Sequence, residues 1–221
     1  MDNEKFEPED NYLKKINNFI FEYERNKKNL NILEFGVREG RSTKIFLDMC
    51  KNNGGKLLSV DIDDYSNLFQ DKNWTFLKAR DDDFIKVSNL FTDKFDIILI
   101  DSFHEPNHVA KLVYLYWKNL KVNGSMYIDD ISWLPYIKGS WRDHEFTENI
   151  NRETFFKILE IQNSNFNSLD VTFNFNGSGM CRIIKENNGN LIKYKKIKPR
   201  SNYIKNNIKK ILQKFKILKS G

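Results

Sequence analysis

Acidic side chains close two apolar runs in the middle of the sequence. Asp101 ends the run 95–101, and Asp129 and Asp130 end the run 125–130. A helical crossover can place two such runs side by side as parallel strands about 4.8 Å apart, so the three carboxylates converge at one sheet edge. Crowded carboxylates repel one another unless a cation joins them, and oxygen ligands favour Mg²⁺, with Ca²⁺ or Mn²⁺ as further candidates. The alternative is that the acids are solvated strand ends and helix caps.

A second chemical pattern, at residues 31–43, indicates a strand, a glycine turn and a helix that begins near Ser42. A helix N-terminus carries unpaired amide groups and partial positive charge, so this turn can hold an anionic or strongly polar group. It is not a P-loop, because three residues separate Gly36 from Gly40 and Arg41 stands where lysine would follow. It is not a dinucleotide fingerprint either, because Arg38 occupies the position of the second glycine.

The pattern Glu34-x-Gly36-x-x-x-Gly40, with Asp61 ending the next apolar run, resembles motif I and the following acid of class I S-adenosylmethionine-dependent methyltransferases. The resemblance implies S-adenosylmethionine as cofactor, with Asp61 on its ribose hydroxyls and Arg80 or Asp81 at its adenine edge. The implied cofactor-binding residues are Glu34, Phe35, Gly36, Arg38, Gly40, Ser42, Asp61, Ile62, Arg80, Asp81 and Asp101. Glu34 favours this interpretation, because an acid in a buried strand is costly without a purpose. The alternative is an α/β domain whose first turn is merely tight.

The segments Ile100-Asp-Ser-Phe-His104 and Tyr127-Ile-Asp-Asp-Ile131 sharpen the resemblance. They look like the Asp-x-x-His and Asp-Asp motifs of metal-dependent small-molecule O-methyltransferases, a branch that includes sugar O-methyltransferases. The resemblance implies Asp101, Asp129 and Asp130 as ligands of a divalent ion and His104 as the general base. Ser102 stands where that family usually has glycine.

His104 has alternatives: it could cap the following helix or pair structurally with Asp101. A zinc face formed by His104 and His108 is disfavoured, because Pro106 between them suggests that the helix begins near that proline. His144 is a second base candidate, though a surface position suits it better.

Apolar periodicity predicts the elements that must position these residues. Strands are expected at 31–35, 56–61, 74–78, 95–101 and 125–130, and helices at 8–28, 42–52, 84–91, 107–120 and 148–162. Strands alternating with helices indicate βαβ units. Two further β-rich runs, 170–175 and 180–185, form a closing antiparallel hairpin around a glycine turn. The expected fold is therefore α/β: a Rossmann-like class I methyltransferase fold with a mostly parallel seven-stranded sheet flanked by helices.

Charge divides the 221 residues into a domain at 1–190 and a tail at 191–221. The tail has eleven Lys or Arg and no acid, so the domain carries 6 − 11 = −5 of the net charge of +6. Apolar residues at helical spacing across 203–218 predict a basic amphipathic helix. It could dock on the domain or on a partner subunit in a homo-oligomer, lie on an anionic membrane, or contact nucleic acid, which is the least favoured.

The sequence has two cysteines, expected to be buried reduced thiols, and no apolar run long enough for a transmembrane helix. A polar, acidic N-terminus argues against a secretory signal, so we expect a cytoplasmic protein, with peripheral contact at the inner membrane face through the tail as the alternative.

The predicted function is transfer of a methyl group to a hydroxyl. A bound cation lowers the pKa of the hydroxyl and a neutral histidine takes its proton. The loop 132–146, with Trp133, Tyr136 and Trp141, is a candidate wall for a sugar or aromatic acceptor, or it simply closes the hydrophobic rim. The resemblance favours a sugar, glycan or other diol as acceptor. Methylation of nucleic acid or protein and a non-catalytic binding role are the alternative functions.

Overall fold

A computed structural model describes residues 9–133, 146–198 and 208. The chain begins with a helical segment made of α1 (Glu9–Ile16), η1 (Asn17–Phe21) and α2 (Glu22–Glu24). Strands and helices then alternate: β1 (Leu30–Phe35), α3 (Arg41–Asn53), β2 (Gly55–Asp61), β3 (Trp74–Lys78), α4 (Phe84–Ser88), β4 (Phe95–Ile100), α5 (Pro106–Tyr116), η2 (Trp117–Asn119) and β5 (Leu120–Asp129). The last described elements are η3 (Phe146–Asn151), α6 (Arg152–Ser164), β6 (Leu169–Asn174) and β7 (Met180–Lys185).

The strands form one seven-stranded sheet in the order β3-β2-β1-β4-β5-β7-β6. The first five are parallel to one another, and β7 pairs antiparallel with both β5 and β6. This confirms the predicted mixed sheet with a closing hairpin. The register pairs Phe35 with both Val60 and Ile100, and Ile100 with Ile128. The carboxyl ends of β2, β1, β4 and β5 therefore lie level at one edge, which is where open α/β sheets bind ligands.

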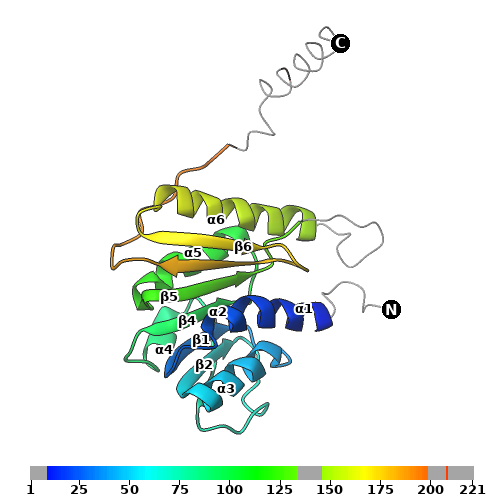
Figure 1. Ribbon diagram of the computed structural model, residues 1–221, viewed down its shortest axis with the longest axis vertical. Coiled ribbons are helices and arrows are strands. Elements are labelled where there is room, and N and C mark those ends of the chain that lie inside the picture. The colour runs from blue at the N-terminus through cyan, green and yellow to red at the C-terminus, as the bar shows by residue number, and fades with distance from the viewer. Residues whose placement is uncertain (1–8, 134–145, 199–207, 209–221) are drawn as a thin grey trace.

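Helices cover both faces of this sheet (Figure 1). Alternate residues of each central strand point to opposite faces, so Leu33 and Ile98 pack on the side of α4, α5 and α6. Ile32 and Ile97 pack on the other side, against α1, η1 and α3. Burial on both faces explains why the sequences of the central strands are mostly apolar. The α1 segment thus lies on the same face as α3, the helix that follows the glycine turn.

Two predicted boundaries were wrong at the start of β5. The helix expected at 107–120 ends at Tyr116, and β5 begins at Leu120 rather than 125, before the local turn signal of the Asn123-Gly124 pair. Asn123 has a φ of 62°, and the β4–β5 register shifts between Phe95 and Ile97. The pair therefore forms an irregularity within a strand, where pairing with β4 overrides the local turn signal. The helix expected at 84–91 is also shorter, ending at Ser88.

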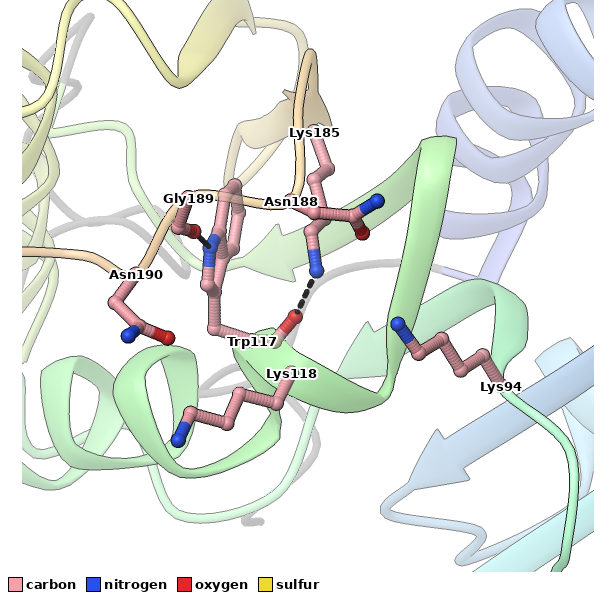
Figure 2. A pocket seen from close by; sticks show the side chains of 7 residues that line it. All are labelled: Lys94, Trp117, Lys118, Lys185, Asn188, Gly189 and Asn190. Atoms are coloured by element: carbon pink, nitrogen blue, oxygen red, sulfur yellow. Dashed lines mark hydrogen bonds between the residues drawn. The ribbon is translucent and has the colours of Figure 1, made fainter.

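The opposite, amino-terminal end of β5 bears a shallow pocket of about 320 Å³, lined by Lys94, Trp117, Lys118, Lys185, Asn188, Gly189 and Asn190. Figure 2 shows the buried Lys185 ammonium donating to the Trp117 carbonyl at 2.8 Å, and it also donates to the Leu120 carbonyl at 2.9 Å. Burial, and secondarily Lys94, lowers the pKa of Lys185 to about 8. This lysine ties the end of β7 to the turn before β5, far from the carboxyl edge.

The described part of the predicted tail, residues 191–198, packs on the domain. The Tyr194 amide donates to the Tyr114 hydroxyl on α5, and the Lys195 amide donates to Ser164 on α6. The amphipathic helix predicted at 203–218 lies, apart from Ile208, outside the described residues. Among the described helices, none has the length and apolar character needed to cross a membrane.

Candidate active site

The glycine turn after β1 is packed against the end of β4. Gly36 has a φ of 91°, and a Cβ at this position would overlap the carbonyl group of Asp101. The Asp101 amide donates to the Phe35 carbonyl at 2.9 Å, and the Gly36 amide donates to the Val60 carbonyl at 3.0 Å. Gly36 therefore does more than leave room for a ligand: it lets β1, β2 and β4 end together. The Phe35 side chain is buried in the core against Tyr116.

Asp61, at the end of β2, supports the same turn. Its Oδ2 accepts hydrogen bonds from the Val37 amide at 2.7 Å and the Arg38 amide at 3.4 Å, and its Oδ1 accepts from Asp63 at 3.1 Å. Arg38 is exposed and has a φ of 49°, so the chain turns sharply beside the carboxylate. A carboxylate has about four lone-pair sites, which leaves acceptor capacity for a hydroxyl ligand.

Glu34 is fully buried beneath the turn and is held by three hydroxyl groups. Ser42 donates to its Oε1 at 2.6 Å, and Thr43 and Ser59 donate to its Oε2 at 2.8 and 2.6 Å. The first two belong to the first turn of α3 and the third to β2, so one carboxylate fixes the start of the helix relative to two strands. Any contribution of Glu34 and Ser42 to cofactor binding acts through this anchoring.

Burial raises the pKa of Glu34 to about 7, although the three hydroxyl donors partly offset the rise. A raised carboxyl pKa means that the folded state binds the proton more tightly, so this group's contribution to stability falls as pH rises from about 4.5 to 7. Between pH 4.5 and 8, the free energy of unfolding of Glu34→Gln should therefore fall by about 3 kcal/mol less than that of the wild type. Urea unfolding at both pH values measures this difference, with exposed Glu39→Gln as control. Equal pH dependence in wild type and Glu34→Gln would contradict the prediction.

The predicted acids do meet at the carboxyl edge, but with different partners. His104 Nε2 lies 3.5 Å from Asp101 Oδ1 and 3.6 Å from Asp130 Oδ2, so the imidazole bridges two of them. Asp130 has a φ of 58°, a left-handed conformation that aspartate tolerates better than most residues. Burial raises the pKa of Asp101, an effect that His104 and the Tyr12 hydroxyl oppose and Asp130 reinforces. The His104 side chain remains 20% exposed, which leaves it accessible to an acceptor.

The α1 helix supplies two contacts to this edge that sequence reasoning missed. The Tyr12 hydroxyl donates to Asp101 Oδ2 at 2.6 Å. The Lys15 ammonium lies 2.5 Å from Asp129 Oδ1 and donates to Ser178 at 2.5 Å, in the turn before β7. The Lys15 and Asp129 side chains are 0% and 4% exposed. Helical spacing placed Tyr12 on the buried face of α1, but no local signal distinguished Lys15 from its solvated neighbour Lys14.

These contacts bear on the predicted metal centre. A divalent ion would need oxygens of Asp101, Asp129 and Asp130 to converge on one point, yet Asp129 is held by Lys15 and the other two flank His104. The donor set, as arranged, does not fit a three-carboxylate site. Within the described ranges, a closely spaced group of ligand-type residues is Asp81, Asp82 and His108. Arg80 and Lys111 already bind Asp82, so that group is charge-balanced by the protein.

The predicted adenine edge contains a buried pair. His108 Nε2 lies 2.9 and 3.0 Å from the two oxygens of Asp81, and Ser102 donates to the same carboxylate at 2.5 Å. Arg80 is turned to Asp82 instead. Sequence reasoning missed Phe103, which is 60% exposed and packs edge-on against His108. Ile62 is likewise 64% exposed just after β2. These two are exposed apolar side chains at the carboxyl edge.

The aromatic segment after β5 is described only at its start. Trp133 packs against Phe155 and Phe156 of α6, with ring centroids 4.9 and 5.9 Å apart. Trp133 itself therefore packs on the hydrophobic side of α6. Tyr136, Trp141 and the alternative base His144 lie outside the described residues.

Comparison with known proteins adds a family to this geometry. Residues 33–131, which run from β1 to just beyond β5, match the model of a family described as a methyltransferase domain. This match supports a methyltransferase domain across these residues. The match includes the glycine turn, Asp61 and the three acids of the carboxyl edge. A comparison of this chain's sequence with curated proteins found no match.

Solved structures with a similar fold are methyltransferases of low sequence identity. MycE from the mycinamycin biosynthetic pathway, in complex with Mg, S-adenosylhomocysteine and mycinamycin VI, has a TM-score of 0.56 and 14% identity over 86% of this chain. The chain spans 58% of the length of MycE. The S-adenosylhomocysteine-bound methyltransferase PaMTH1 of Podospora anserina has a TM-score of 0.59 and 14% identity, covering 76% of this chain and 77% of its own. A candidate caffeoyl-CoA O-methyltransferase from Staphylococcus aureus has a TM-score of 0.57 and 14% identity, covering 79% and 82%. These likenesses support the predicted class I methyltransferase fold.

Proposed function

We propose that this methyltransferase uses S-adenosylmethionine to methylate a hydroxyl group of a small diol-containing acceptor, with a sugar or glycan as the first choice. The observation that carries the proposal is the juxtaposition of the glycine turn and Asp61 with His104 and its two carboxylates along one sheet edge. The first group suits a cofactor with a ribose, and the second suits removal of a proton from an acceptor.

The proposed cofactor site follows the strand ends from β2 to β4. Asp61 would accept the ribose hydroxyls, and Gly36 would let the methionine part pass close to the backbone. The exposed Ile62 and Phe103 would flank the adenine ring, while Asp81 would act through its buried pair with His108. Gly40 and Ser42 would shape the start of α3, with the Arg38 side chain at the rim.

Asp61→Ala should weaken S-adenosylhomocysteine binding at least tenfold, because the ribose loses its acceptor and the turn loses two amide contacts. Isothermal titration of the apo-protein measures this affinity. The neighbouring Asp63→Ala is the matched control, since Asp63 is exposed. Unchanged affinity in Asp61→Ala would remove Asp61 from the site.

At the acceptor side, His104 would take the hydroxyl proton while the sulfonium methyl is transferred in line to the oxygen. Asp101 and Asp130 would orient the imidazole, since each has a carboxylate oxygen within 3.6 Å of Nε2. MycE was solved with Mg, whereas here Lys15 holds Asp129, so the proposed mechanism relies on the protein's own side chains.

Methyl transfer from labelled S-adenosylmethionine to sugars, nucleotide sugars and catechols tests the proposal. We expect a diol-containing acceptor to be methylated on oxygen. Tight cofactor binding without transfer to any member of the panel would favour the non-catalytic binding role. Transfer to RNA or protein would favour a methyltransferase of nucleic acid or protein. Homo-oligomer formation and contact of the tail with anionic lipid remain predictions, as does cytoplasmic localisation.

A further inference from the structure

The acidic edge of the sheet is covered by one face of α1. Tyr12 and Lys15 are three residues apart and so lie on the same side of the helix, where Tyr12 reaches Asp101 after β4 and Lys15 reaches Asp129 at the end of β5. The helix is held in this position from below, because Ile16, Phe19 and Ile20 are buried in the core with Ile97, Leu99 and Tyr127. The two polar contacts are therefore made by a packed element rather than by an exposed side chain.

Lys15 and Asp129 form a buried ion pair at the acidic edge. Both side chains are almost completely buried, their charged atoms are 2.5 Å apart, and Ser178 accepts a further hydrogen bond from the ammonium. Breaking a buried pair is strongly unfavourable, since it leaves an uncompensated charge out of water. A divalent ion bound to Asp129 would have to displace this ammonium or lie beside it, like charge against like charge.

We propose that the Lys15 ammonium supplies the positive charge that balances the acidic edge, so that methyl transfer by this protein requires no divalent cation. The inference about methyl transfer rests on the proposed function, whereas the inference about ion binding does not. Lys15 acts as a positioning residue: it holds Asp129 and α1 so that Asp101 and His104 keep their geometry. The same contact gives the acids at this strand edge a positive partner from the protein itself.

Mn²⁺ tests whether the acidic edge binds a divalent ion, because its electron paramagnetic resonance signal distinguishes free from bound ion. With apo wild-type protein we expect no ion bound more tightly than about 1 mM. In Lys15→Met the aliphatic volume is kept and the charge removed, so Asp129 loses the ammonium beside it and the edge should bind Mn²⁺ at least tenfold more tightly than wild type. The exposed Lys14→Met, on the same helix, is the matched control and should resemble wild type.

Methyl transfer in excess EDTA tests whether turnover requires a divalent cation. Wild type should keep full turnover, whereas Lys15→Met should lose at least tenfold and recover part of it with Mg²⁺. If Lys15→Met does not fold, Lys15→Gln, which can still donate to Ser178, replaces it. The proposal is overturned if wild type binds one Mn²⁺ that Asp129→Asn abolishes, or if a folded Lys15 variant gains no Mn²⁺ affinity. Failure of S-adenosylhomocysteine to bind would instead overturn the proposed function, leaving the Mn²⁺ result to stand.

Discussion

Gly36→Ala should destabilise the protein by about 3–5 kcal/mol and abolish S-adenosylhomocysteine binding. The positive φ of Gly36 alone costs an alanine about 1 kcal/mol or more. The larger part is steric, because the added Cβ would overlap the Asp101 carbonyl, which is backbone and cannot rotate away. Relief requires the end of β1 to move off the end of β4, which separates the glycine turn from the acidic edge. Urea unfolding and isothermal titration measure the two effects.

Gly40→Ala is the matched control for this prediction. Gly40 also has a positive φ, of 72°, but its added Cβ would meet the Phe69 ring at 2.7 Å, and that ring is a side chain that can shift. We expect a loss of about 1–2 kcal/mol and retained binding. Equal losses in the two variants would show that backbone strain, not the contact with Asp101, makes glycine necessary at position 36.

His104→Ala should reduce kcat for methyl transfer by about 10²–10⁴-fold, the usual contribution of a general base. The affinity for S-adenosylhomocysteine should stay within about twofold of wild type, because the imidazole contacts Asp101 and Asp130 rather than the glycine turn. Single-turnover rates with an acceptor that the wild type methylates, and titration with S-adenosylhomocysteine, measure the two quantities on the same preparation.

His104→Gln separates the base from the structural alternative, in which His104 merely pairs with Asp101. Glutamine can hydrogen-bond to a carboxylate but cannot accept a proton at neutral pH. If His104 is the base, this variant should be as inactive as His104→Ala while unfolding like wild type. More than about a tenth of wild-type activity in His104→Gln would assign the base role elsewhere.

Sequence reasoning placed the strands of the sheet and the ends that carry chemistry, because buried parallel strands leave a plain apolar signal that stops at Asp61, Asp101 and Asp129. It misplaced the start of β5, where the Asn123-Gly124 turn signal is outweighed by pairing with β4. Tertiary pairing of this kind leaves no local trace in the sequence.

The partners of the site residues were harder to predict than the residues themselves. Glu34 was noticed as an unusual acid, but its three hydroxyl donors come from separate elements. Lys15 carries no signal in the sequence, since nothing near it shows that Asp129 and Ser178 lie above it. Sequence patterns identify which side chains face inward, whereas charge compensation depends on contacts between distant segments.

The contacts of α1 also bear on the order in which the molecule assembles. Tyr12 and Asp101 are 89 residues apart in the chain, and Lys15 and Ser178 are 163 apart. During synthesis the first helix emerges long before its last partner, so the ammonium lacks its hydrogen bond to Ser178 until the turn before β7 is in place. Closing such long loops is entropically costly and slow compared with local pairing. We therefore expect the carboxyl edge to become competent in one late step, with the final hairpin and the first helix locking together, rather than gradually as each strand is added.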